Sequence, residues 1–223
     1  MNPAAVEEAE NLLFEEWRSR LAVDGESYFV PDGVIESGAY ANSKPKIVVV
    51  LKETNDPGEG SSLCEILRTT PPHYTWNTVT RWVRAIRSLP DEIPWQEISD
   101  VDMTTRIDVL RTIAVMNVKK TAGGSVASNA ELEKHSQRFR DLIERQVALY
   151  SPDIILLCGF SWKLSEPFGK RAEWHRTSRG TWFRRLENGV PVIHTRHPAN
   201  RLEGELLHYP VIDAVRELLF NNE

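Results

Sequence analysis

Three short segments constrain the fold most, because each is an apolar run followed at once by polar residues. They are residues 47–58 (IVVVLKETNDPG), 113–120 (IAVMNVKK) and 192–199 (VIHTRHPA). A continuous apolar run of this kind is typical of a strand buried on both faces, as in the parallel sheet of an α/β protein. Ligands of such sheets bind outside the carboxyl ends of the strands. We therefore expect Asp56, Asn117 and His197, which follow the three runs, to meet in one crevice.

The rest of the chain alternates between helical and strand patterns. Apolar spacing predicts helices over 4–21, 62–68, 75–88 and 208–220, and a Ser128–Glu131 capping box starts another that runs to about Tyr150. Strands are predicted over 46–52, 112–117 and 153–158, followed by a hairpin of 182–186 and 190–193 around Asn188-Gly189. Residues 31–33 read as a turn, 89–102 as a loop and 121–125 as a flexible linker. This alternation predicts one α/β domain over residues 1–223, with the N-terminal helix packed on it.

Size and composition exclude several classes of protein. A chain of 223 residues suits one compact α/β domain or two small ones. No apolar stretch is long enough to cross a bilayer and the N-terminus is acidic, so we expect a cytoplasmic protein without membrane contact. Two cysteines, Cys64 and Cys158, are too few for a four-cysteine metal or iron–sulfur site, and we expect neither a metal nor another cofactor.

Charge is distributed unevenly along the chain. Residues 160–201 contain nine Lys or Arg against three Glu, in a chain whose overall charge is −5. Such a local excess of positive charge suits a one-sided phosphate-binding face, although a solvated arginine-rich surface remains an alternative.

Each candidate site residue has a structural alternative. Asn-Asp-Pro-Gly at 55–58 is good turn chemistry as well as a stiff mount for the Asp56 carboxylate. Asn117 offers a donor and an acceptor to a base edge, or else caps neighbouring backbone. Lys119 and Lys120 are candidates for phosphate contact or for simple solvation. His194 and His197 are three residues apart, but no further ligand cluster accompanies them, which argues against a metal.

In their order and spacing, these segments resemble the uracil-DNA glycosylase superfamily. The resemblance rests on Asp-Pro-Gly after the first strand, Asn-Val-Lys after the second, Pro-Asp-Ile-Ile-Leu-Leu-Cys-Gly in the third and a late His-Pro-Ala, with Gln146-Val147 in the preceding helix. It covers about 46–202 and is closest to the bacterial and archaeal branches that normally carry an iron–sulfur cluster. It implies a three-layer α/β/α fold whose mostly parallel central sheet has about four strands.

The resemblance also implies a function. Asp56 would activate water, Asn117 would recognise a pyrimidine flipped out of DNA, and His197 would steady charge on the leaving base. Lys119, Lys120, Arg196 and Arg201 would contact DNA phosphates, and Tyr74, His73 or Trp76 would stack on the base, Tyr74 being our choice. The expected partner is single- or double-stranded DNA.

This chain departs from the family pattern in several places. Thr54 stands where the family usually has Gly, Glu53 is a rival acid, and Lys120 and its neighbours stand where a cluster cysteine would fall. Two other functions therefore stay open at this point: a catalytically inactive nucleic-acid-binding relative, and an enzyme acting on free nucleosides or nucleotides.

Overall fold

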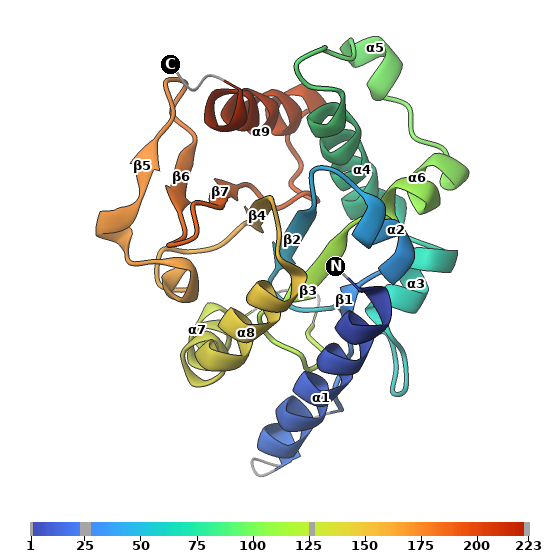
Figure 1. Ribbon diagram of the computed structural model, residues 1–223, viewed down its shortest axis with the longest axis vertical. Helices are drawn as coiled ribbons and strands as arrows, with labels where there is room; N and C mark the ends of the chain where they lie inside the picture. Colours follow the sequence, from blue (N-terminus) through green and yellow to red (C-terminus); the bar gives the residue numbers. More distant parts are fainter. Residues whose placement is uncertain (1, 23–27, 125–127, 221–223) are drawn as a thin grey trace.

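The computed structural model of the chain describes residues 2–22, 28–124 and 128–220 (Figure 1). Its strands form one mixed sheet in the order β1-β3-β2-β4-β7-β6-β5. The strands are β1 (Gly33–Val34), β2 (Ile47–Leu51), β3 (Ala114–Asn117), β4 (Ile154–Cys158), β5 (His175–Arg176), β6 (Trp182–Arg185) and β7 (Pro191–Thr195). The α-helices are α1 (Pro3–Ala22), α2 (Ser37–Asn42), α3 (Leu63–Thr69), α4 (His73–Ser88), α5 (Trp95–Ile98), α6 (Met103–Leu110), α7 (Asn129–Arg138), α8 (Arg140–Tyr150) and α9 (Gly204–Leu219), with 3₁₀ turns at Glu166–Phe168 and Arg171–Glu173.

The α/β class is confirmed, but the expected number of strands is not: the sheet has seven strands rather than about four. Its four inner strands, β3, β2, β4 and β7, run parallel, while β1, β6 and β5 are added antiparallel at the two edges. The unforeseen strands β1 and β5 have two residues each, which is too short to leave an alternating pattern in the sequence.

The order of the parallel strands fixes where a ligand would bind. From β2 the chain continues to β3 on one side, and then crosses to β4 on the other side of β2. In sheets of this kind, the crevice at such a reversal of direction, outside the carboxyl ends of the strands, is the usual ligand site. The topology therefore points to the segments that follow β2 and β4.

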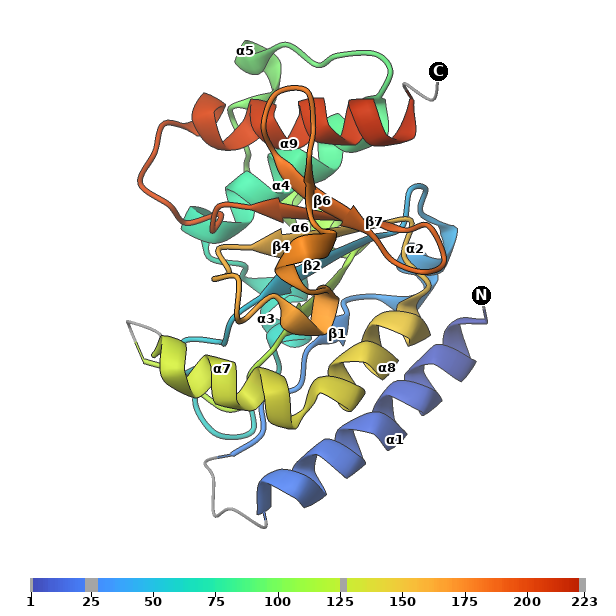
Figure 2. The same ribbon diagram turned by 90° about the vertical axis from the view of Figure 1, so that its left-hand side faces the viewer.

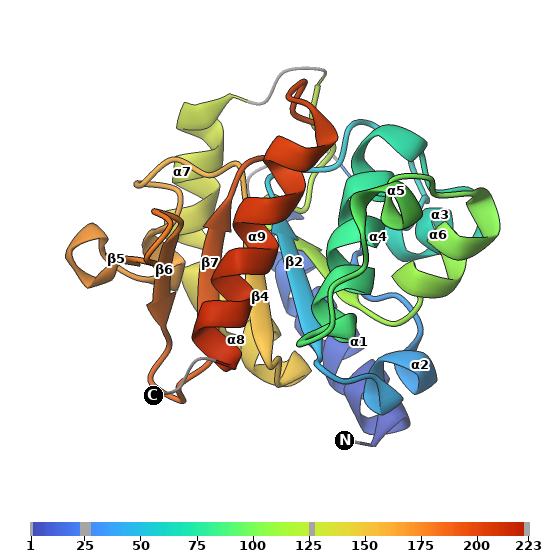
Figure 3. The ribbon, with the colours of Figure 1, turned by 90° about the horizontal axis from the view of Figure 1, so that it is seen from above.

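Helices cover both faces of the sheet, so the molecule has three layers (Figures 2 and 3). Val49, Val115 and Leu156 share a buried cluster with α3, α4, α6 and α9, while Val48, Met116 and Leu157 share another with α1, α7 and α8. Alternate residues of each strand point to opposite layers, and both layers are apolar. This two-sided burial explains why the strands are apolar throughout.

Several predicted elements have different limits in the structure. The predicted loop over 89–102 contains the one-turn helix α5, and α6 was not predicted. The predicted helix from 128 to 150 is two helices that meet at the buried Phe139, whose backbone leaves the helical region with φ −103° and ψ 20°. The final helix begins at Gly204 instead of 208.

The two segments expected to be a turn and a linker are tied to the sheet region. Gly33 belongs to β1 and pairs with Val115 of β3. In the expected linker, Thr121 pairs with Phe29 and Gly123 with Asn55 through isolated bridges, whereas Ser125 lies outside the described residues. None of the described helices is both long and apolar enough to span a membrane.

Candidate functional site

The carboxyl ends of the four parallel strands lie along one edge of the sheet. Asn117, the last residue of β3, is in register with Leu51 at the end of β2, and Thr195 of β7 is in register with Cys158 of β4. Asp56 and His197 lie in the segments that leave β2 and β7 at this same edge. The topology therefore brings the three predicted segments to one edge, as the pattern of apolar runs predicted.

Asn117 is held rigidly at this edge. Its side chain is buried, and its Nδ2 donates to Thr54 Oγ1 at 2.7 Å. Among the described residues, its buried Oδ1 has no hydrogen-bond partner. A buried amide oxygen without a donor costs free energy, so an N–H group that reached it would form a favourable hydrogen bond. The second Nδ2 hydrogen is a further donor beside it.

A buried ion pair that was not predicted from the sequence binds the backbone of Asn117. The Asp32 carboxylate accepts from the Asn117 backbone N–H at 2.6 Å and from Lys120 Nζ at 2.7 Å through each of its oxygens. Both side chains of the pair are fully enclosed. Burial lowers the pKa of Lys120, and the Asp32 carboxylate opposes that shift. Lys120 also lies over the Trp17 ring, with Nζ 4.8 Å from the centroid.

This pair corrects the role expected for Lys120. Its ammonium is enclosed and occupied by Asp32, so it is not available to a phosphate in this structure. Asp32 was interpreted as part of a turn because Pro-Asp-Gly is typical turn chemistry. The burial of both residues is a consequence of packing against α1 and α8, which residue type alone does not reveal.

The pair extends into a longer buried network. Gln146 Nε2 donates to Asp32 at 3.0 Å and contacts the Tyr150 hydroxyl at 2.7 Å, and that hydroxyl donates to Glu10 Oε1 at 2.6 Å. Burial raises the pKa of Glu10 to about 7, against the hydrogen bonds from Tyr150 and the Val34 N–H. The network therefore links α1 to the end of β3. Its sequence signal was the position of Glu10, which lies on the same helical face as Leu13 and Trp17.

Lys119 and the rival acid Glu53 are paired with each other. Their Nζ and Oε2 atoms are 2.9 Å apart and both side chains are nearly enclosed, and Glu131 lies 3.7 Å from the same Nζ. A side chain at Gly123 would lie 2.2 Å from the Glu53 carboxyl carbon, so Gly123 is what lets Glu53 fold back onto Lys119. Glu53 is thus used in an ion pair and is a weaker candidate than Asp56 for activating water.

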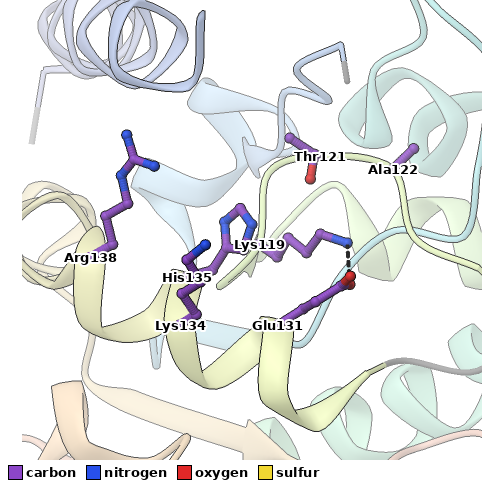
Figure 4. Close-up of a pocket in the computed structure, with 7 residues that line it drawn as sticks. All are labelled: Lys119, Thr121, Ala122, Glu131, Lys134, His135 and Arg138. Atoms are coloured by element: carbon purple, nitrogen blue, oxygen red, sulfur yellow. Dashed lines mark ion pairs between the residues drawn. The ribbon is translucent and has the colours of Figure 1, made fainter. Parts of the chain in front are cut away.

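A cavity of about 290 Å³ lies between the segment after β3 and α7, and Lys119 is one of the residues that line it (Figure 4). Lys119 and Glu131 meet in an ion pair at one side of it, and Lys134, His135 and Arg138 line the side formed by α7. Asp56, Asn117 and His197 do not line this cavity. The cavity is therefore next to the candidate site but separate from it.

Asp56 is exposed in the loop after β2. Its Oδ1 accepts from the Gly58 N–H at 2.9 Å and from the Tyr28 hydroxyl, and its own N–H donates to the Gly123 carbonyl at 3.2 Å. These contacts hold the loop and use one carboxylate oxygen, Oδ1. The turn interpretation and the site interpretation of Asn-Asp-Pro-Gly are thus both compatible with the geometry.

His197 packs closely against the end of β4. Gly159 has φ +72°, and a Cβ there would lie 2.8 Å from His197 Cβ, so both conformation and space require glycine. The Ala199 N–H donates to His197 Nδ1 at 3.1 Å. Burial, together with the nearby Lys52 charge, lowers the pKa of His197. The ring is therefore neutral near pH 7 and, with Nδ1 accepting, carries its proton on Nε2.

The remaining predicted residues are less closely tied to this edge. Tyr74 is 77% exposed in the first turn of α4 and packs on His73, with ring centroids 4.1 Å apart. Trp76 is buried in the core and cannot stack on a base. Arg196 and Arg201 are exposed, as residues that contact phosphates need to be.

The described residues contain no group of three or more His, Cys, Asp or Glu side chains placed to hold a metal ion. No family model matches this chain, and no curated protein matches it either. What the candidate site does must therefore be argued from its geometry.

Proposed function

We propose that this chain is a DNA glycosylase-like hydrolase of the cytoplasm, which cleaves the N-glycosidic bond of uracil or another deaminated base flipped out of DNA. The observation that carries the proposal is the buried Asn117 amide, whose Oδ1 lacks a donor at the carboxyl edge of a parallel sheet. Uracil presents an N–H next to a carbonyl oxygen, which complements Oδ1 and the second Nδ2 hydrogen of Asn117. The motif order described above supports the same assignment.

His197 has the properties required to stabilise the leaving base. When the glycosidic bond breaks, the electron pair of the bond goes to the base and the sugar carbon becomes positive. A neutral imidazole with its proton on Nε2 donates a hydrogen bond to a base carbonyl without transferring the proton. Asp56 would face the sugar and orient the water that adds to it, with the water proton passing to solvent or to the base.

The test uses single- and double-stranded oligonucleotides that carry one uracil, followed by alkali to cleave at abasic sites. We expect His197→Ala to lower turnover by about 10²–10³-fold, as loss of one positioned donor does elsewhere. Asp56→Asn should lower turnover with little loss of DNA affinity, whereas Tyr74→Phe, which keeps the ring, should leave both unchanged. Absence of abasic sites with uracil, hypoxanthine and xanthine substrates contradicts the proposal.

A second candidate is a catalytically inactive relative that binds nucleic acid. It is favoured by the contacts of Asp56 Oδ1 with Tyr28 and Gly58, and of Asn117 Nδ2 with Thr54, because each occupies part of a group that the reaction needs. Binding of the same oligonucleotides without cleavage supports this candidate. Tyr28→Phe releases the carboxylate, so a gain of cleavage in that variant would instead identify Tyr28 as a brake on an active site.

A further inference from the structure

Three tryptophans and a histidine form an aromatic cluster at the β7-β6-β5 end of the sheet. The ring centroid of Trp162 lies 5.1 Å from that of Trp182, 5.9 Å from that of Trp174 and 5.1 Å from that of His194. Trp174 is buried, whereas Trp162 and Trp182 are half-buried. The cluster is therefore a rigid aromatic base with one side open to the surface.

An arginine lies on each of the two half-buried tryptophans. Arg171 Cζ is 5.3 Å from the Trp162 centroid, and Arg176 Cζ is 4.5 Å from the Trp182 centroid. Both arginines are exposed, and among the described residues neither has a carboxylate within ion-pair distance. Stacking of this kind restricts the guanidinium while its N–H groups keep their capacity for two hydrogen bonds.

Neighbouring arginines make different contacts. Some form ion pairs with carboxylates, whereas Arg171 and Arg176 lie on tryptophan rings. Arg184 is paired with Glu173 at 2.6 Å, and Arg179 with Asp213 at 3.5 Å. Seven of the nine cationic residues between 160 and 201 have no ion pair in the described chain; Arg185 donates to the Gly189 and Leu218 carbonyls instead, and the others are Lys163, Lys170, Arg171, Arg176, Arg196 and Arg201. Carboxylates thus neutralise part of the positive charge of this region, whereas Arg171 and Arg176 keep an exposed, unpaired charge on the two tryptophans.

The cluster is directly connected to the candidate site. His194 Nε2 is hydrogen-bonded to the Phe160 carbonyl at 3.0 Å, and His194 lies three residues before His197 on the same strand and loop. Trp162 lies three residues after Gly159, which packs against His197. Figure 3 shows β7, β6 and β5 side by side at one end of the sheet. A strand that reaches the candidate site from this end would pass the two arginines.

We propose that Trp162, Trp182, Arg171 and Arg176, here called the Trp–Arg surface, bind consecutive phosphates of a nucleic-acid strand and guide it to the candidate site. The proposal rests on the proposed function for its partner. Planar guanidinium groups match phosphate oxygens, and the tryptophans hold them in place before the strand arrives. The other exposed cations of the region add attraction that depends on salt.

The experiment measures binding of a fluorescent single-stranded oligonucleotide of thymidines, by anisotropy, at several salt concentrations. Because this oligonucleotide carries no uracil, its binding is independent of base excision. The test variant is Arg171→Gln with Arg176→Gln. The control is Arg20→Gln with Arg145→Gln, which removes the same charge from two arginines that are paired with Glu16 and Asp141 on α1 and α8.

We expect the test variant to bind at least about tenfold more weakly at low salt, and its slope of log K against log salt to fall by about 1.4, or about 0.7 for each lost contact. The control should change affinity less than twofold. Arg171→Lys with Arg176→Lys keeps the charge but loses the planar fork, so it should give an intermediate loss. Trp162→Leu with Trp182→Leu should also weaken binding, because the arginines lose their support.

Three outcomes would overturn the proposal: no binding by the unaltered protein, equal losses in the test and control variants, or equal binding of polyglutamate through the same two arginines. The last outcome would assign the surface to an acidic protein. Loss of oligonucleotide binding in the test variant, in a protein that excises no base, would keep the Trp–Arg surface and remove the glycosylase assignment.

Discussion

The two ends of the sheet use charged residues in opposite ways. At the β1-β3 end, Lys120 and Asp32 are enclosed and paired, and their hydrogen bonds continue through Gln146 and Tyr150 to α1. At the β6-β5 end, Arg171 and Arg176 are exposed on tryptophans without a carboxylate partner among the described residues. A charge inside the protein contributes to holding one structure, whereas an exposed charge on a rigid support is available to a ligand. The comparison predicts large stability effects at the first end and small ones at the second.

Removing one member of the buried pair should have the largest effect. Lys120→Met leaves the Asp32 carboxylate buried without its cation, and we expect a loss of about 3–5 kcal/mol in the free energy of unfolding. Lys44→Met is the control, because Lys44 is 75% exposed and 3.6 Å from Asp153; its loss should stay below about 1 kcal/mol. Urea unfolding measures both.

A double variant separates the charge from the shape of the site. In Asp32→Asn with Lys120→Met, an amide oxygen still accepts from the Asn117 N–H, and no unpaired charge remains. We expect it to be more stable than Lys120→Met alone. If Lys120→Met costs no more than Lys44→Met, the contrast between the two ends of the sheet is wrong.

The second effect concerns pH. The pKa of Glu10 rises from 4.5 in the unfolded chain to about 7 in the fold, so the folded protein holds a proton that the unfolded chain releases. The contribution of Glu10 is fully present below pH 4.5 and is lost as pH rises through 7. It amounts to about 3 kcal/mol, at 1.36 kcal/mol for each pKa unit.

Glu10→Gln isolates this contribution, because glutamine keeps an oxygen for Tyr150 and the Val34 N–H but does not titrate. The difference in unfolding free energy between the unaltered protein and Glu10→Gln should therefore fall between pH 4.5 and 7.5, measured by urea unfolding at each pH. Because both proteins contain the same histidines, taking the difference cancels the histidine contribution to the pH dependence. The lowered pKa values of the histidines make stability increase as pH rises, which is opposite to the effect of Glu10. A difference that is flat with pH would show that Glu10 is ionised in the fold.

The sequence predicted the structure best where a residue pattern is compatible with only one environment, such as an apolar run that must be buried. The run Ile47–Leu51 is apolar on both faces, and it predicted a buried strand and the edge where its polar successors emerge. Lys119 and Lys120 show the limit. They are adjacent and of the same type, yet one is paired with the nearly enclosed Glu53 and the other with the fully enclosed Asp32. Which acid each lysine meets depends on how the segments around residues 32 and 53 pack, and spacing does not carry that information.

The candidate site, like the fold, could be predicted from the sequence only in part. Strand order placed Asn117 and His197 at one edge, but the proton position of His197 depends on the Ala199 N–H, which only the folded turn supplies. The aromatic cluster was hidden because Trp162, Trp174 and Trp182 come from three separate segments. Its arginines were visible only as an excess of charge.

The smallest effect is expected at the Trp–Arg surface itself. Arg171→Gln with Arg176→Gln removes two exposed cation–π contacts, each worth about 0.5–1 kcal/mol at most in such a position, and creates no unpaired buried group. We expect its unfolding free energy to change by less than about 2 kcal/mol in urea, which is less than in Lys120→Met. A loss as large as that of Lys120→Met would mean that these arginines hold the hairpin together, and a weaker binding of oligonucleotide in this variant would then report unfolding instead of lost phosphate contacts. A small loss, together with weaker binding, separates the two roles of charge at the two ends of the sheet.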